Sequence, residues 1–255
     1  MDEPLYLKDP YAKEFDSEVV DVFDGKNVVL RETVFYPQGG GQPGDTGLLA
    51  AADGQKFTVT NTRKFGGNAL HELEKPGLVP GQKVHGEIDW VRRYLLMRNH
   101  TAAHILSGVI HKLHGAMITG NQLGTDKTRI DFSLEDFSKE QMEGFIEEAN
   151  AVVDAGHEVK AYYLTKEEAA NVEEISKLAK GLPPDITNIR VVDIVGFDRQ
   201  PDGGTHVKNT KEVGHLALLK CENKGASNRR AYFTLPKEAP DTQFNPQKKS
   251  DTPRL

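Results

Sequence analysis

Short apolar runs alternate with turn residues over the first 88 positions. The runs are rich in Val, Ile, Phe and Thr, and turn pairs such as Asp24-Gly25 and Pro80-Gly81 separate them. Runs of this kind bounded by Gly, Pro and Asp predict strands. Several short strands at this spacing favour a barrel or a sandwich. We therefore predict a small N-terminal β-barrel domain over residues 1–88, with strands at Val19–Phe23, Asn27–Leu30, Lys56–Thr60 and Lys83–Ile88.

The pattern changes to a helical period at Asp89, a good N-cap residue. Trp90–His114 contains no proline, and its first glycine is Gly108. Its apolar residues fall on one broad side at 100° per residue. His100 and His104 are spaced i, i+4 and project together from the opposite side. We therefore expect the histidine pair to face a cleft or solvent rather than the main core.

The rest of the chain mixes helices and strands. Ser138–Ala155 begins like a capping box and predicts a helix, and Thr165–Lys180 predicts another. Strands are predicted at Ile189–Phe197, His215–Cys221 and Arg230–Leu235. The fold class is therefore α+β, with a second domain over residues 89–235. The tail over residues 236–255 is rich in Pro, Lys, Asp and Gln, which predicts disorder.

Composition limits the classes of protein. The 255 residues are 37% hydrophobic and 27% charged, as in soluble globular proteins. No apolar run approaches the ~18 residues of a membrane span, so we expect no membrane partner. Cys221 is the only cysteine, which excludes an intrachain disulfide and favours the reducing cytoplasm.

Charge is unevenly distributed. The net charge of −6 argues against general coating of nucleic acid, and no DNA partner is expected. Residues 135–174 hold 12 acidic and three basic residues, which leaves about +3 for the rest. Basic residues then gather between Thr205 and Arg230. An anionic partner could meet this basic region alone, although an unevenly charged solvated surface is an equal alternative.

The histidine pair on the predicted helix could fill two positions of a zinc site. Taken alone, the spacing also fits surface histidines on an ordinary helix, and His111 on the same stripe is interpreted in that way. Thr101 rather than glutamate follows His100, which disfavours a zincin-type protease. His206, in the Gly-rich loop Pro201–His206, could supply a third imidazole and leave a position open for water, or the loop could be a plain turn.

A second Gly-rich stretch runs from Pro37 to Gly47. Five of the nine residues from Gly39 to Gly47 are glycine. The stretch lacks the Gly-Lys-Ser/Thr ending of a phosphate-binding P-loop. Two interpretations remain open, a hairpin or a close backbone approach to a ligand or another domain.

Together these features resemble the editing domain of alanyl-tRNA synthetase and its free-standing relatives, the AlaX alanyl-tRNA editing proteins, in their medium-length form. The resemblance spans about Thr33 to Leu235. Six stretches carry it in the family's order: Thr33–Gly47 (TVFYPQGGGQPGDTG), His100–Leu106 (HTAAHIL), Arg129–Phe132 (RIDF), Arg190–Phe197 (RVVDIVGF), Gly203–Gly214 (GGTHVKNTKEVG) and Gly225–Arg230 (GASNRR). It implies a second domain of the threonyl/alanyl-tRNA synthetase second-additional-domain type.

The resemblance also implies an activity. A zinc-dependent hydrolase would deacylate tRNA(Ala) mischarged with serine or glycine. Rival functions are a non-catalytic zinc-bearing tRNA-binding module and a zinc hydrolase for small molecules. The general base stays open between Asp202, a zinc-bound hydroxide and the neighbouring ribose hydroxyl.

The resemblance implies a set of site residues. The zinc ligands would be His100, His104 and His206. The family's usual cysteine is replaced by Asp202, which could be the fourth ligand or act on a zinc-bound water, or Cys221 could reach the metal instead. Thr119 stands where the family reads the extra hydroxyl of serine, and the alternative is a loop threonine without a role. The other predicted substrate-binding residues are Gly39, Gly40, Gly41, Gln42, Lys208, Lys211, Arg229 and Arg230, with Lys224, Arg92, Arg93 and Arg98 as further candidates for tRNA phosphates.

Overall fold

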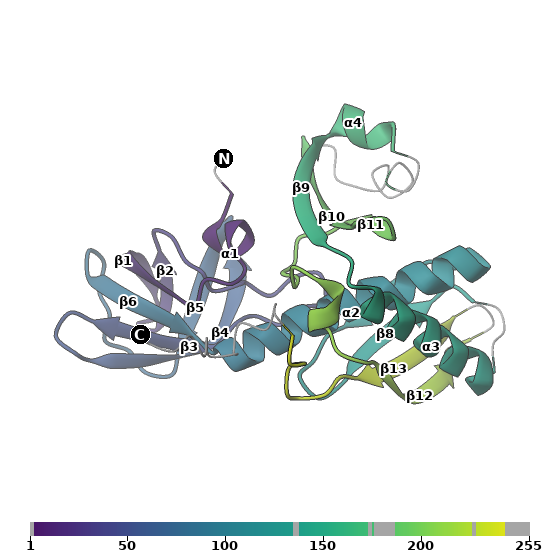
Figure 1. Cartoon of the computed structure of the whole chain (residues 1–255). Coiled ribbons are helices and arrows are strands. Elements are labelled where there is room, and N and C mark those ends of the chain that lie inside the picture. The colour runs from purple at the N-terminus through teal and green to yellow at the C-terminus, as the bar shows by residue number, and fades with distance from the viewer. Residues whose placement is uncertain (1–2, 135–137, 173–174, 176–186, 226–227, 243–255) are drawn as a thin grey trace, which may run out of the picture. The chain divides into compact units, whose positions relative to one another are not determined.

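The computed structural model of the chain describes residues 3–134, 138–172, 175, 187–225 and 228–242 (Figure 1). The chain divides into two compact units, of which the first comprises residues 1–100, 122–125 and 203–205. The second comprises residues 101–121, 126–202 and 206–255. Among the described residues, no helix is long and apolar enough to cross a lipid bilayer.

The first unit contains a closed antiparallel barrel in the order β1-β2-β5-β4-β3-β6 (Figure 1). A short helix, α1 (Leu5–Lys8), precedes it. Closure gives every strand of the barrel two neighbours, which removes the exposed edges through which small sheets aggregate. The strands are β1 (Glu14–Phe23), β2 (Asn27–Leu30), β3 (Gly47–Ala51), β4 (Lys56–Phe65), β5 (Asn68–Leu73) and β6 (Lys83–Ile88).

Alternating side chains fill the barrel interior. In β6, Val84, Gly86 and Ile88 are buried while the residues between them are exposed. A Cβ at Gly86 would lie 2.3 Å from Cε1 of Phe15, so the glycine makes room for that ring. All four strands predicted for this region are confirmed, and β3 and β5 are additional.

The Gly-rich stretch approaches the barrel's own strands closely. A Cβ at Gly44 would lie 1.9 Å from the carbonyl oxygen of Thr62, and one at Gly47 would lie 2.1 Å from that of Glu87. Gly40 adopts a positive φ of 58° where the chain turns. At Gly44 and Gly47 the glycines are therefore explained by packing within the barrel.

Helix α2 (Trp90–His114) begins directly after the predicted N-cap residue Asp89 and spans the predicted range. The carboxylate of Asp89 accepts a hydrogen bond from Arg92 N at 3.1 Å, as an N-cap does. Gly115 has a φ of 66° and donates from its N–H to the His111 carbonyl at 2.7 Å, which terminates the helix. Every residue from 93 to 110 is buried. The histidine side is thus as buried as the apolar side, which corrects the expectation that it could face solvent, because the helical period fixes directions but not what covers them.

The second unit contains two sheets. A four-stranded sheet has the order β12-β13-β8-β7, and a three-stranded sheet has the order β11-β10-β9. Helix α3 (Lys139–Ala155) contacts β12 and the 3-10 helix η1 (Thr210–Glu212). The architecture confirms the predicted α+β class with an N-terminal barrel. The strands are β7 (Ile118–Gln122), β8 (Thr128–Phe132), β9 (Val159–Thr165), β10 (Asn188–Ile194), β11 (Asp198–Pro201), β12 (Ala217–Asn223) and β13 (Arg229–Thr234).

The predicted helices are found where the chain is described. The Ser138 side chain accepts from Gln141 N, and the Gln141 side chain accepts from Ser138 N, so the capping box of α3 is confirmed. The second predicted helix corresponds in part to α4 (Lys166–Ala170), and its remainder includes residues 173–174 and 176–180, which lie outside the described residues. Residues 236–242 of the predicted disordered tail contain no helix or strand, and residues 243–255 lie outside the described range.

Candidate metal centre

Four side chains that could ligate a metal ion converge near the middle of α2. His100 and His104 stand one turn apart on that continuous helix, and Asp202 and His206 stand on the segment that follows β11. The potential ligand atoms of all four residues lie within 4.8 Å of one another. The three histidines are 1%, 6% and 7% exposed in chain order. The structure thus brings together the four residues predicted as metal ligands.

Asp202 is held through its main chain. Its N–H donates to the carbonyl of Arg190 on β10 at 3.1 Å, and Nη1 of Arg190 donates to the Asp202 carbonyl at 3.0 Å. The first bond continues the antiparallel pairing of β10 with β11 by one residue beyond Val191 and Pro201, and the second comes from the Arg190 side chain. The end of this sheet and the Arg190 guanidinium together hold the main chain of Asp202.

His206 is held by contacts at both ring nitrogens. Its Nδ1 lies 3.2 Å from the Thr101 hydroxyl, and its Nε2 lies 2.9 Å from a carboxylate oxygen of Asp202. The Thr101 hydroxyl also accepts from the Val207 N–H at 3.3 Å. The rings of His206 and His104 meet edge to face with centroids 4.7 Å apart. Thr101 therefore orients the His206 ring through Nδ1, while Nε2 faces the Asp202 carboxylate.

Gln42, from the Gly-rich stretch, orients His100. The amide is fully buried, and its oxygen lies 3.1 Å from Thr205 N and 3.1 Å from His100 Nδ1. Its nitrogen donates to the Thr205 hydroxyl at 2.8 Å. A backbone N–H can only donate, so the atom facing Thr205 N is the amide oxygen. His100 Nδ1 must then carry its proton, which leaves Nε2 with the lone pair that a metal needs.

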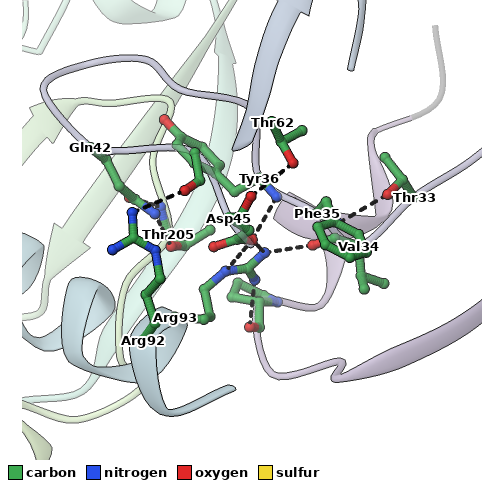
Figure 2. A network of polar contacts seen from close by, with 12 residues as sticks. Thr33, Val34, Phe35, Tyr36, Gln42, Asp45, Thr62, Arg92, Arg93 and Thr205 are labelled. Carbon is green, nitrogen blue, oxygen red and sulfur yellow. Dashed lines mark hydrogen bonds and ion pairs between the residues drawn. The ribbon is translucent and has the colours of Figure 1, made fainter. Parts of the chain in front are cut away.

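A buried ion pair holds the stretch that carries Gln42 (Figure 2). Nε of Arg93 donates to the Asp45 carboxylate at 2.8 Å, and Nη2 donates to the Val34 carbonyl at 2.5 Å. The same carboxylate accepts from Tyr36 N at 2.7 Å, and the Thr62 hydroxyl donates to the Asp45 carbonyl at 2.9 Å. Arg93 is 0% exposed, and its guanidinium braces the loop. The expectation that Arg93 contacts tRNA phosphates is therefore wrong. Arg98 is buried too, which overturns the same expectation for it.

The donor set fits a zinc ion. Three buried imidazoles and one partly buried carboxylate oxygen form a combination that Zn²⁺ binds in tetrahedral sites. In two of the three histidines, His100 and His206, Nδ1 has a hydrogen-bonding partner, which leaves Nε2 for a metal, as is usual for metal-binding imidazoles. Cys221 lies on β12 opposite Ala231 and is not part of the group. The alternative that Cys221 completes the site is therefore wrong.

The predicted substrate-binding residues have varied surroundings. Thr119 is exposed on β7, and its hydroxyl donates to the Asn228 side chain at 3.0 Å. Arg230 makes two bonds of 2.6 and 2.9 Å to Asp131, which raises the pKa of its guanidinium. Arg229 is buried and donates to the Gly225 carbonyl at 2.7 Å. Both arginines therefore support the four-stranded sheet and its loop.

The remaining positions with a predicted role lie in loops or at the surface. Lys208 is exposed two residues before η1, and Lys211 is exposed within it. Lys224 is exposed and paired with Glu222 at 3.0 Å. Gly39 pairs with Gln42 through two backbone hydrogen bonds, with Gly40 and Gly41 between them. His111 lies at the surface with Nδ1 3.3 Å from the Ala116 carbonyl, as interpreted from its spacing.

Comparison with known proteins defines the class of protein. The family described as "Threonyl and Alanyl tRNA synthetase second additional domain" matches residues 189–232, which include Asp202 and His206. The family described as "tRNA synthetases class II (A)" matches residues 7–92. Both stretches are thus similar to parts of aminoacyl-tRNA synthetases.

Full-length relatives define the family. The alanyl-tRNA editing protein AlaX-M of Methanosarcina barkeri is 47% identical over 241 residues, which cover 92% of this chain and 99% of the relative. AlaX-M of Saccharolobus solfataricus is 44% identical over the same shares of each chain. The alanine–tRNA ligase of Pyrococcus furiosus is 39% identical over 222 residues, only 24% of its length. The chain belongs to the AlaX-M family of alanyl-tRNA editing proteins.

Proposed function

We propose that this chain is a hydrolase that removes serine or glycine wrongly attached to tRNA(Ala), with Zn²⁺ held by His100, His104, Asp202 and His206. The convergence of ligand atoms from three buried histidines and the partly buried Asp202 within 4.8 Å carries the proposal. Membership in a family of alanyl-tRNA editing proteins supports the choice of substrate. The bond to be broken is the ester that joins the amino acid to the terminal ribose.

The protein's own residues hold the site in place for this reaction. When bound, zinc would polarise the ester carbonyl or activate water. Gln42 and Thr101 orient the imidazoles of His100 and His206, and Arg190 positions Asp202. Because these partners are preformed, little reorganisation is needed during the reaction.

Asp202 acts as the fourth ligand in this proposal. Its side chain is only 13% exposed, and its carboxylate lies 2.9 Å from His206 Nε2. A carboxylate oxygen that already stands beside one imidazole nitrogen is placed to share the same ion. The alternative role, as a base that acts on water, leads to a different result in the experiment below.

Selectivity requires a polar group that reads serine against alanine. A site built to bond the serine hydroxyl is left with an unpaired polar group when alanine enters, which disfavours alanine strongly. Thr119 stays the predicted reader of that hydroxyl. Its hydrogen bond to Asn228 shows that its oxygen is oriented by a neighbouring side chain.

Deacylation of Ser-tRNA(Ala), Gly-tRNA(Ala) and Ala-tRNA(Ala) by the purified, zinc-loaded chain tests the proposal. We expect release of serine or glycine and sparing of alanine. Asp202→Ala should lose both zinc and activity if the carboxylate is a ligand, but only activity if it is the base. Cys221→Ser is the matched control and should keep both. Binding of tRNA(Ala) without turnover would favour the non-catalytic module instead.

A further inference from the structure

The four-stranded sheet of the second unit has a buried side and a partly exposed side. In β13, Ala231 is fully buried, whereas its neighbours Arg230 and Tyr232 are partly exposed. Successive side chains of a strand point to opposite sides of a sheet, so Arg230 and Tyr232 share the exposed side. Residues that pair directly across strands lie on the same side. The exposed side therefore continues through Lys220 on β12 and Arg129 on β8, which are the partners of Tyr232.

Positive charge predominates on this exposed side. The ammonium groups of Lys127 and Lys220 lie 5.5 and 4.6 Å from the centroid of the Tyr232 ring. Five cations stand beside two carboxylates, a local balance of +3 in a chain whose net charge is −6. We name this surface the basic face, and its charged members are Lys127, Arg129, Asp131, Lys220, Glu222, Lys224 and Arg230.

Both carboxylates of the basic face are already engaged by cations. Asp131 accepts hydrogen bonds of 2.6 and 2.9 Å from Arg230. Glu222 lies 2.6 Å from Nζ of Lys220 and 3.0 Å from Nζ of Lys224, and these two ammonium groups lower its pKa to about 2. The two carboxylates thus stay ionised and balance only two of the five cations. The remaining positive charge is available to an anionic partner.

The opposite side of the same sheet is covered by an acidic helix. Helix α3 contacts β12 and holds five acidic residues and one basic residue. Burial, together with the Glu143 carboxylate on α3, raises the pKa of the Cys221 thiol. Cys221 pairs with the buried Ala231, so α3 lies on the side away from the basic face. An anionic polymer is therefore attracted to one side of this sheet and repelled from the other.

The basic face is suited to phosphates rather than to bases. Two ammonium groups already lie against the Tyr232 ring, so this ring does not offer the open surface on which a base stacks. The cations are spread over the adjacent strands β12, β13 and β8 (Figure 1), which places Lys220 and Arg129 roughly 10 Å apart across Tyr232. Proteins recognise double-helical RNA by its shape and through its phosphates and 2′-hydroxyls, whereas binders of single strands depend on stacking.

We propose that the basic face binds the phosphate backbone of a double-helical arm of the tRNA substrate. The inference rests on the proposed function, since that function makes tRNA the anionic partner. It places an RNA contact on β8, β12 and β13, whereas the metal ligands lie on α2 and after β11. The basic face holds the body of the tRNA and takes no part in cleavage of the ester.

Binding of uncharged tRNA(Ala) to the zinc-loaded full chain at several salt concentrations tests the inference. The informative variant combines Lys127→Ala with Arg129→Ala, because Asp131 then keeps both of its bonds from Arg230. We expect this double variant to weaken binding about 10-fold and to reduce the slope of log Kd against log salt by about 0.7–0.9 for each lost contact. Arg129→Lys keeps the charge and should retain most of the affinity. Zinc content and circular dichroism verify that each variant is folded.

Lys139→Ala combined with Lys166→Ala is the matched control. Both lysines are exposed on helices of the second unit, α3 and α4, and their loss changes the net charge by the same amount. The control should keep the wild-type Kd and salt slope, and an equal effect of the two double variants would overturn the assignment. An RNA hairpin that copies the acceptor stem should show the same dependence on Lys127 and Arg129. Equal or tighter binding of a single-stranded RNA of the same length would overturn the double-helical assignment.

The results separate this inference from the proposed function. If the wild-type chain deacylates Ser-tRNA(Ala) but the Lys127 and Arg129 double variant binds tRNA as well as wild type, the basic face is wrongly assigned and the function stands. If the double variant loses RNA affinity while the wild-type chain hydrolyses no mischarged tRNA, the function fails and the RNA-binding face stands. If the double variant changes the sedimentation of the chain but not its affinity for RNA, the face joins two copies of the chain and the inference is overturned.

Discussion

His71 in the barrel and His104 on α2 are both buried histidines, but their surroundings are different. His71 is 0% exposed, with Nδ1 3.0 Å from the Val28 carbonyl and Nε2 2.9 Å from the Thr33 hydroxyl. A carbonyl can only accept, so Nδ1 donates and Nε2 accepts from Thr33. The neutral ring is satisfied on both sides. Burial accordingly lowers its pKa from 6.5 to about 4.

His104 belongs instead to a set of imidazoles gathered from separate parts of the chain. Its ring meets that of His206 edge to face, and a carboxylate joins them. Burying several basic rings together is unfavourable for folding unless something uses their lone pairs. Burial alone therefore does not distinguish a structural histidine from a metal ligand, whereas the convergence of several donor atoms does.

The largest effect should come from removing a ligand. We expect His206→Ala to bind far less than one zinc per chain and to lose more than about 100-fold in deacylation rate. Mutating a residue that only hydrogen-bonds a metal ligand typically costs 10–100-fold in metal affinity or activity, and removing a ligand itself should cost more. His71→Gln is the matched buried control and should keep its zinc. Elemental analysis after dialysis, with circular dichroism to verify folding, measures both. Equal loss of zinc in a folded His71→Gln protein would remove the distinction between the two places.

The pH dependence of stability should report His71. Since its folded pKa is lower than its unfolded pKa, the unfolded chain binds more protons between pH 6.5 and 4. The contribution of the neutral His71 ring to the free energy of unfolding is fully present above pH 6.5 and is lost as the pH falls to about 4. At 1.36 kcal/mol per pKa unit, this loss amounts to about 3 kcal/mol. The free energy of unfolding in denaturant measures it. The difference between wild type and His71→Gln should follow this window, and a pH-independent difference would contradict the assignment.

Gln42→Ala should have an intermediate effect. Without the amide, His100 Nδ1 loses the acceptor that fixes its tautomer, and loss of such a partner typically weakens metal binding 10–100-fold. Gln42→Glu keeps an acceptor oxygen and should lose less. Competition with a zinc chelator measures the affinity, and a cobalt-substituted protein reports the ligand geometry independently. Unchanged affinity in Gln42→Ala would show that the helix alone orients His100.

Much of the fold could be predicted from local patterns, because period and turn residues act locally. The strands missed in the barrel are β3 and β5, with sequences GLLAA and NALHEL. Alanine, leucine and asparagine carry little preference for strands. These segments become strands by pairing with neighbours on both sides in the barrel. The domain boundary at residue 88 stays a prediction.

The candidate site was only partly predictable. The histidine spacing indicated two ligands, the Gly-rich loop Pro201–His206 offered His206 as a third, and the resemblance added Asp202. The roles of Thr101 and Arg190 were missed, since a threonine in a helix and an arginine in a strand give no signal by themselves. Gln42 was predicted to bind substrate. Its bond to His100 joins residues 58 positions apart, which no local pattern can indicate.

The smallest effect should come from Lys208 and Lys211, which are exposed shortly after His206. If both contact phosphates, the double substitution to alanine should raise KM for Ser-tRNA(Ala) a few-fold and reduce the salt dependence of log KM by about 0.7–0.9 for each lost contact. Arg230 is a poorer probe, because its loss would leave Asp131 without its partner. Lys56 and Lys83 are exposed on barrel strands and provide the matched double control. Kinetics at several salt concentrations measure both pairs. An equal change of slope in the barrel pair would mean that tRNA is attracted by general charge, and that the lysines beside the metal ligands have no special place in binding it.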